Sequence, residues 1–84
     1  MKLKLLRLPE VLKHRGNRSR ASHYRDIQQS LFTKPINIGP RSVAWPAHEV
    51  DAINLARLAG KPEQEIKILV KELEAARAAG GEAQ

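Results

Sequence analysis

The chain has 84 residues, enough for one small domain whose thin core leaves little room for an enclosed catalytic cavity. It contains no cysteine, which excludes disulfides and thiolate metal sites and favours a reducing compartment. The net charge of +6 is uneven: residues 1–45 hold ten Lys or Arg against two acidic residues, and residues 46–84 hold five against seven. The basic half predicts a polyanionic partner, although a solvated basic surface with no partner would give the same count.

The apolar run around Leu5-Leu6 is short and is interrupted by Arg7 and Pro9. It does not reach the length of a membrane span or of a signal-peptide core, so we expect a soluble, cytoplasmic protein. An anionic membrane surface fits the basic half less well, because that half lacks a long amphipathic helix of the interfacial kind.

A short strand and a first helix are predicted at the start of the chain. Residues 3–8 partly alternate as a strand does, and Pro9 suits the first position of a helix over residues 9–14. Its apolar contacts would be Leu8, Val11 and Leu12. Gly16-Asn17 predicts a turn, because both residues tolerate a left-handed backbone.

Ser19 is a good N-cap for a second helix that runs to about Ser30. Helical spacing predicts a buried stripe of Ala21, Tyr24, Ile27 and Leu31. The remaining residues would face elsewhere: Arg20, Ser22, His23, Arg25 and Asp26. Two short helices joined by a glycine-containing turn are typical of a helix-turn-helix, a signature that many unrelated small helical proteins also carry.

A basic hairpin is predicted directly after the second helix. Residues 35–38 and 41–45 read as strands, and Gly39-Pro40 reads as the turn between them. Such a hairpin is typical of a wing, which would carry Lys34, Asn37, Arg41 and Ser42. We expect Trp45 to fix the hairpin to the core rather than to stack on a base.

Two further helices complete the prediction. The helix over residues 46–59 has apolar residues on more than one face and should touch two surfaces. The helix from Pro62 carries an amphipathic stripe, and Gly80-Gly81 and the last three residues are expected to fray. The stripe either packs on its own domain or joins protomers, with a tentative oligomer interface of Ile66, Leu69, Val70 and Leu73.

Several ordered segments resemble one known family: residues 6–12 (LRLPEVL), Gly16, Ser19-Arg20, Tyr24-Arg25, Ile27, Leu31-Phe32, residues 34–36 and 39–43, Trp45 and residues 49–52. Together they resemble the AlpA-type phage regulators over about residues 6–59. The resemblance implies a MerR-like winged helix-turn-helix in a DNA-binding protein of a prophage or integrative element. Some members activate an integrase or excisionase gene, and related small proteins act as recombination directionality factors.

Three positions depart from the family pattern. The turn carries one extra residue around Asn17-Arg18, Ala21 stands where serine is usual, and His23 stands where an apolar residue is common. We expect the fold to tolerate these changes and the base preference to differ.

In this interpretation the N-terminal end of the second helix enters the major groove of double-stranded DNA. Arg20 and Arg25 would contact either guanine edges or phosphates, and Ser19, Ser22 and Tyr24 would hold phosphates. Lys34 and Arg41 would reach the adjacent backbone or minor groove. The full set of expected DNA contacts is Arg18, Ser19, Arg20, Ser22, His23, Tyr24, Arg25, Lys34, Asn37, Arg41 and Ser42.

Nothing in the sequence predicts an enzyme. His14, His23 and His48 match no metal-ligand spacing, so neither a metal nor a cofactor is expected. The carboxylates that might suggest acid–base chemistry lie at predicted helix starts, where negative charge is structurally favourable: Glu49, Asp51, Glu63 and Glu65. The chain also lacks a glycine-rich phosphate loop and a nucleophile motif.

The predicted fold is mainly α with a small β-hairpin wing, arranged as a winged helix-turn-helix over residues 1–60 and a C-terminal helical extension over residues 61–84. Three functions compete: a transcriptional regulator of integrase and excision genes, an excisionase that bends attachment-site DNA, and a protein-binding module such as an antirepressor. Expected partners are double-stranded DNA, further copies along the DNA, and an integrase or RNA polymerase, in the bacterial cytoplasm at the nucleoid.

Overall fold

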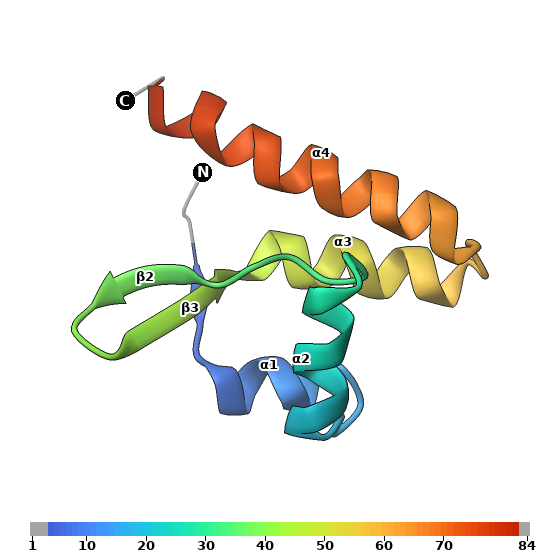
Figure 1. The fold of residues 1–84 in the computed structure, drawn as a ribbon, viewed down its shortest axis with the longest axis horizontal. Coiled ribbons are helices and arrows are strands. Elements are labelled where there is room, and N and C mark those ends of the chain that lie inside the picture. Colours follow the sequence, from blue (N-terminus) through green and yellow to red (C-terminus); the bar gives the residue numbers. More distant parts are fainter. Residues whose placement is uncertain (1–3, 83–84) are drawn as a thin grey trace.

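A computed structural model describes residues 4–82, with side chains as far as Ala78. The elements follow in the order β1 (Leu5–Leu6), α1 (Leu8–His14), α2 (Arg20–Gln28), β2 (Ile36–Gly39), β3 (Ser42–Pro46), α3 (Ala47–Leu58) and α4 (Glu63–Glu82). In Figure 1, α4 runs along one edge of the molecule beside α3, α1 and α2 lie at the opposite edge, and the β2–β3 hairpin projects sideways. The predicted class, mainly α with a hairpin wing, is confirmed.

The three strands form one antiparallel sheet in the order β1-β3-β2. Leu5 pairs with Pro46 and Leu6 with Trp45, so β1 holds β3 on the side away from β2. The strand predicted over residues 3–8 is shorter in the structure, where it covers only Leu5–Leu6, because α1 already begins at Leu8. Leu3 lies outside the described residues. We call β2, β3 and their turn the wing.

The turn between α1 and α2 uses two successive left-handed residues, Gly16 at φ 80° and Asn17 at φ 61°. Asparagine tolerates this conformation better than most residues with a side chain, so the extra residue is accommodated in the turn. The backbone N–H of Arg18 donates to the Leu12 carbonyl at 3.1 Å, and the Ser19 hydroxyl accepts from the Ser22 N–H at 3.1 Å. The predicted turn and N-cap are confirmed.

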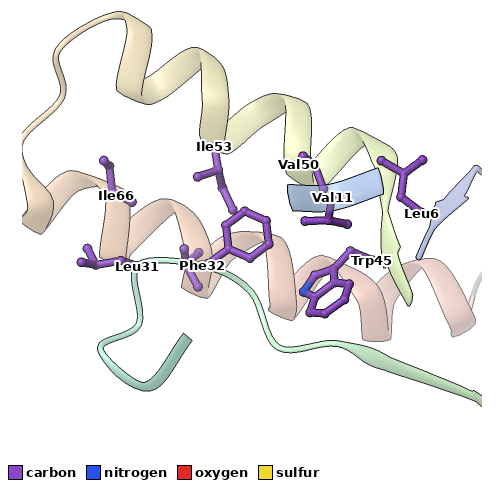
Figure 2. Close-up of a cluster of buried hydrophobic side chains, with 9 residues drawn as sticks. Leu6, Val11, Leu31, Phe32, Trp45, Val50, Ile53 and Ile66 are labelled. Carbon is purple, nitrogen blue, oxygen red and sulfur yellow. The ribbon is translucent and has the colours of Figure 1, made fainter. Parts of the chain in front are cut away.

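The core lies between the sheet and the helices, and Figure 2 shows Ile53 pointing from α3 towards the Phe32 ring. Trp45 is fully buried, and its indole N–H donates to the Thr33 carbonyl at 2.9 Å. The prediction that Trp45 fixes the hairpin to the core is confirmed. The fully assembled core cluster comprises Leu6, Val11, Leu31, Phe32, Trp45, Val50, Ile53, Ile66 and Val70.

The buried face predicted for the second helix is right for Leu31, which is in the core, and for Ile27, which packs against it, but wrong for its first half. Ala21 and Tyr24 are exposed, whereas His23 and Asp26 are buried. Hydropathy periodicity gave this error because it treats His and Asp as surface residues, and here both have polar partners inside the protein.

The C-terminal helix packs on its own domain. Ile66 and Val70 are buried in the core and Leu69 and Leu73 are partly buried against it, so the stripe that the sequence offered as a tentative oligomer interface packs within one molecule. As predicted, α3 touches two surfaces, β3 and α4. The helix α4 continues through Glu82, so the fraying predicted at Gly80-Gly81 is wrong. Residues 83–84 lie outside the described residues.

Candidate nucleic-acid interface

The N-terminal end of α2 is an exposed basic surface. The backbone leaves Ser19 in an extended conformation and enters the helix at Arg20, which places Ser19, Arg20, Tyr24 and Arg25 in solvent and Ser22 half-buried. Figure 1 shows this end of α2 at the edge of the molecule opposite α4. The predicted contacts on α2 are thus accessible, with the exception of His23; Arg20 opens the first turn and Arg25 lies in the last turn.

The wing adds one exposed cation. Arg41 lies at the hairpin turn with φ 56° and an exposed side chain. Asn37 and Ser42 shape this turn, because the Asn37 Oδ1 accepts from the Gly39 N–H at 3.1 Å and the Ser42 hydroxyl donates to the Pro40 carbonyl at 3.2 Å. Of the predicted wing residues, Arg41 therefore has the side chain best placed to reach outward.

Ile38 is an exposed wing residue that the sequence analysis did not select. Its side chain is 44% exposed between Asn37 and Gly39. Alternation of β2 could not have revealed this exposure, because it places Ile38 on the same face as Ile36, and the register shift between Asn37 and Gly39 interrupts the alternation in the structure.

A buried ionic cluster joins α2 to the end of α1. The Arg15 guanidinium, with a side chain 2% exposed, donates to Asp26 Oδ2 at 2.7 Å and lies 4.2 Å from the centre of the Phe32 ring. Arg18 reaches the same carboxylate, with Nε 2.7 Å from Oδ2 and Nη2 3.1 Å from Oδ1. Burial raises the pKa of Asp26, but the hydrogen bonds from Arg18 and Arg15 outweigh it and leave that pKa below its ordinary value.

This cluster decides the charge that α2 presents. Asp26 is the one acidic residue in α2, and it is 5% exposed and paired with two arginines. The accessible surface of α2 therefore shows the charges of Arg20 and Arg25 without an opposing carboxylate from the same helix. Arg15 was not among the residues predicted for the site; an arginine before the Gly16 turn and a lone Asp in a basic helix were the available signal.

Arg18, expected to contact DNA, is committed to Asp26 while its side chain remains 36% exposed. Its guanidinium therefore fixes the turn before α2 and reaches solvent only in part.

His23 was expected at the DNA surface, and this is wrong in the structure. The side chain is fully buried, with its ring edge-to-face against Phe32 and Trp45 at 5.0 Å between centroids. Its Nδ1 lies 2.8 Å from the Arg15 Nη1, which can only donate, so the neutral ring carries its proton on Nε2. Burial, reinforced by the Arg15 charge, lowers the pKa of His23 to about 4. His23 thus fills a core position where an apolar residue would also fit.

Lys34 lies in the segment between α2 and the wing. Its side chain is exposed at an open groove of about 300 Å³ between α2 and α4. Phe32, Val70, Lys67 and Lys71 also line this groove. The Lys34 backbone is held by α4: its N–H donates to Glu74 Oε2 at 2.8 Å, and its carbonyl accepts from Arg77 Nη2 at 2.7 Å.

Among the described residues, no three His, Asp or Glu side chains gather where they could bind a metal ion. In the same part of the chain, no helix combines the length and the apolar character needed to cross a membrane.

Comparison with known proteins places these elements in a family. The family model described as "Prophage CP4-57 regulatory protein (AlpA)" matches residues 4–52, from β1 into α3. The chain is also 36% identical over 58 residues to the uncharacterized protein ORF88 of Enterobacteria phage P4, a match that covers 69% of this chain and 65% of that relative. The chain thus spans just under two thirds of that relative's length, and it matches no solved structure. Since the family match covers more than half of the sequence, this chain belongs to the AlpA family of prophage regulatory proteins.

Proposed function

We propose that this protein is a sequence-specific DNA-binding regulator of a prophage or integrative element, acting on integrase and excision genes. One observation carries the proposal: α2 exposes Arg20 in its Ser19-capped first turn and Arg25 in its last turn, while the single acid of α2 is buried and ion-paired. Membership of a family described as prophage regulatory supports the same function.

In the proposed complex the N-terminal end of α2 lies in the major groove. Arg20 and Arg25 pair with guanine edges or phosphates, and the Ser19 and Tyr24 hydroxyls contact phosphates. Arg41 on the wing reaches the neighbouring backbone or minor groove. Action on DNA implies a cytoplasmic, nucleoid-associated protein whose partners include an integrase or RNA polymerase.

Any assembly of further copies along DNA would use surfaces other than Ile66 and Val70 of α4, because these two side chains are buried within one molecule.

The test is selection of a binding site from random duplex DNA, followed by titration at fixed physiological salt with the wild type, Arg20→Ala and Lys67→Ala. Each variant removes one exposed positive charge, the first from α2 and the second from α4. Arg20→Ala is expected to lose roughly 5- to 150-fold in affinity for the selected site, the value of one specific base contact. Lys67→Ala should bind the selected site as the wild type does. Reduced affinity with unchanged site preference in Arg20→Ala would assign Arg20 to a phosphate, and unchanged affinity and preference would refute its role at the DNA.

A footprint on the element's own DNA distinguishes the three possible roles. Protection limited to the integrase-gene promoter supports the regulator. Protection of repeated sites beside the attachment core, with bending, would assign an excisionase instead. No protection of either, and no selected site, would reject DNA binding and favour a protein-binding module such as an antirepressor.

A further inference from the structure

We propose that α4, although it lies outside the family-matched residues and away from the proposed DNA surface, sets the position of the wing on DNA through Glu74 and Arg77. The inference rests on the proposed function for its effect on DNA affinity. Its structural half, the control of wing mobility by α4, concerns the protein without DNA.

The segment between α2 and β2 depends on tertiary contacts for its backbone hydrogen bonds. The peptide unit that joins Thr33 to Lys34 is held on both sides, because its carbonyl accepts from the Trp45 indole at 2.9 Å and its N–H donates to Glu74 at 2.8 Å. The next carbonyl, that of Lys34, accepts from Arg77 at 2.7 Å. Two consecutive peptide units are therefore fixed immediately before β2 begins.

Arg77 is itself held in place by a buried acid. Its Nε and Nη2 donate to the two carboxylate oxygens of Glu49 at 2.8 and 2.6 Å, and Glu49 is fully buried at the start of α3. A planar guanidinium bound by two parallel hydrogen bonds has little freedom to rotate. Its remaining contact with Lys34 is therefore directed rather than incidental.

The two strands of the wing are supported differently. β3 pairs with β2 along residues 42–44, pairs with β1 at Trp45 and Pro46, and continues directly into α3, whereas β2 is an edge strand paired with β3 alone. The start of β2 is fixed instead by two hydrogen bonds of the Lys34 backbone, whose N–H donates to Glu74 and whose carbonyl accepts from Arg77. Loss of these bonds should free one strand of the wing, and with it the direction in which Arg41 points, while α2 keeps its own cap and ionic cluster.

Glu74→Ala tests this positioning role, and Glu72→Ala is its matched control. Both changes remove one negative charge from α4 and replace Glu with a strong helix former. Of the two glutamates, Glu72 is exposed and only Glu74 accepts a hydrogen bond from the Lys34 N–H. Arg77→Ala is less informative, because it would leave the buried Glu49 without its partner and could unfold the domain.

The binding experiment is a double-mutant cycle with Arg41→Ala on the selected DNA site. We expect Glu74→Ala to weaken binding roughly three- to thirtyfold, with Glu72→Ala equal to the wild type, and we expect Arg41→Ala to cost less in the Glu74→Ala protein than in the wild type. A purely structural role of Glu74 would leave the Arg41→Ala effect unchanged between the two backgrounds. That additive result, or equal affinity of the two Glu→Ala variants, would overturn the inference.

The companion measurement uses the free proteins. NMR relaxation of the amides of residues 36–42 should show increased motion in Glu74→Ala and wild-type motion in Glu72→Ala, with residues 20–28 unchanged in both. Unchanged relaxation of the wing in Glu74→Ala would overturn the inference even if the wild type fails to bind DNA. Failure of the wild type alone to bind refutes the proposed function instead.

Discussion

At the scale of single residues, polar side chains inside the domain define the end of α2 that faces outward. Arg15 contacts the Asp26 carboxylate, the His23 ring and the Phe32 face at the same time. Burying an ion pair costs desolvation, so the pair is weak evidence for stability, but removing one partner would leave a buried charge without compensation. Here it orients α2 relative to the α1 turn and removes the one carboxylate of α2 from the basic surface.

His23 predicts a loss of stability in mild acid. Its pKa is lowered from 6.5 to about 4 on folding, chiefly by burial, so between these values the unfolded chain binds more protons than the folded one. Stability due to His23 is therefore complete above pH 6.5 and falls as the pH drops towards 4, by roughly 3 kcal/mol in total. Denaturant titrations at several pH values would measure this slope.

His23→Gln should flatten the slope between pH 6.5 and 4, because glutamine does not titrate and can still accept from Arg15. His14→Gln is the control, since that side chain is exposed and the slope should persist. An unchanged slope in His23→Gln would show that the acid sensitivity arises elsewhere. Asp26 adds to acid sensitivity at lower pH, because a lowered pKa means stability lost as the carboxylate protonates.

At the scale of elements, most helix and strand starts follow from local signals. Pro9, Ser19 and Gly60 mark boundaries for reasons contained in the residue itself: a fixed φ, a capping oxygen and a left-handed backbone. These elements could therefore be predicted within a few residues. The buried face of α2 could not, because it depends on which partners Asp26 and His23 meet in the folded protein.

The cap of α2 gives a prediction at this scale. Ser19→Ala removes the acceptor of the Ser22 N–H and should destabilise the protein by about 1 kcal/mol, lowering Tm by roughly 4–8 °C. Ser19→Asp should restore Tm, because aspartate also caps helices, but it should weaken DNA binding, because it places a negative charge at the proposed interface. Thermal melts and DNA titrations of both variants measure the two effects separately. Tight DNA binding by Ser19→Asp would argue that this end of α2 does not face DNA.

At the scale of the whole molecule, the uneven charge of the sequence becomes a spatial separation. The basic residues 4–45 form α1, α2 and the wing, and the residues that carry most of the acids form α3 and α4 on the other side of the core. This arrangement leaves α4 to pack against the core rather than to meet a polyanion.

Removing α4 should therefore unfold the domain. A chain ending at Lys61 lacks the buried Ile66 and Val70, which together contribute roughly 3–6 kcal/mol, and leaves buried Glu49 without Arg77. That loss is comparable to the whole stability expected for a domain of this size, about 4–13 kcal/mol. Circular dichroism melts and NMR peak dispersion would measure it. A truncated chain with a cooperative transition near that of the full chain would contradict this account of α4.

The sequence by itself determined the class of the fold, the order of its elements, the place of Trp45 in the core and the exposed basic end of α2, because each depends on short-range periodicity, capping or residue size. Only the tertiary structure decided that His23 is buried, that Asp26 is neutralised by Arg15 and Arg18, and that the stripe of α4 packs within one molecule. The same holds for the hydrogen bonds from α4 to the Lys34 backbone. The ionic cluster and the Lys34 hydrogen bonds join groups that are distant along the chain. The apolar stripe of α4 fits its own core and a partner equally well. Periodicity within one helix carries no information about which partner that helix meets.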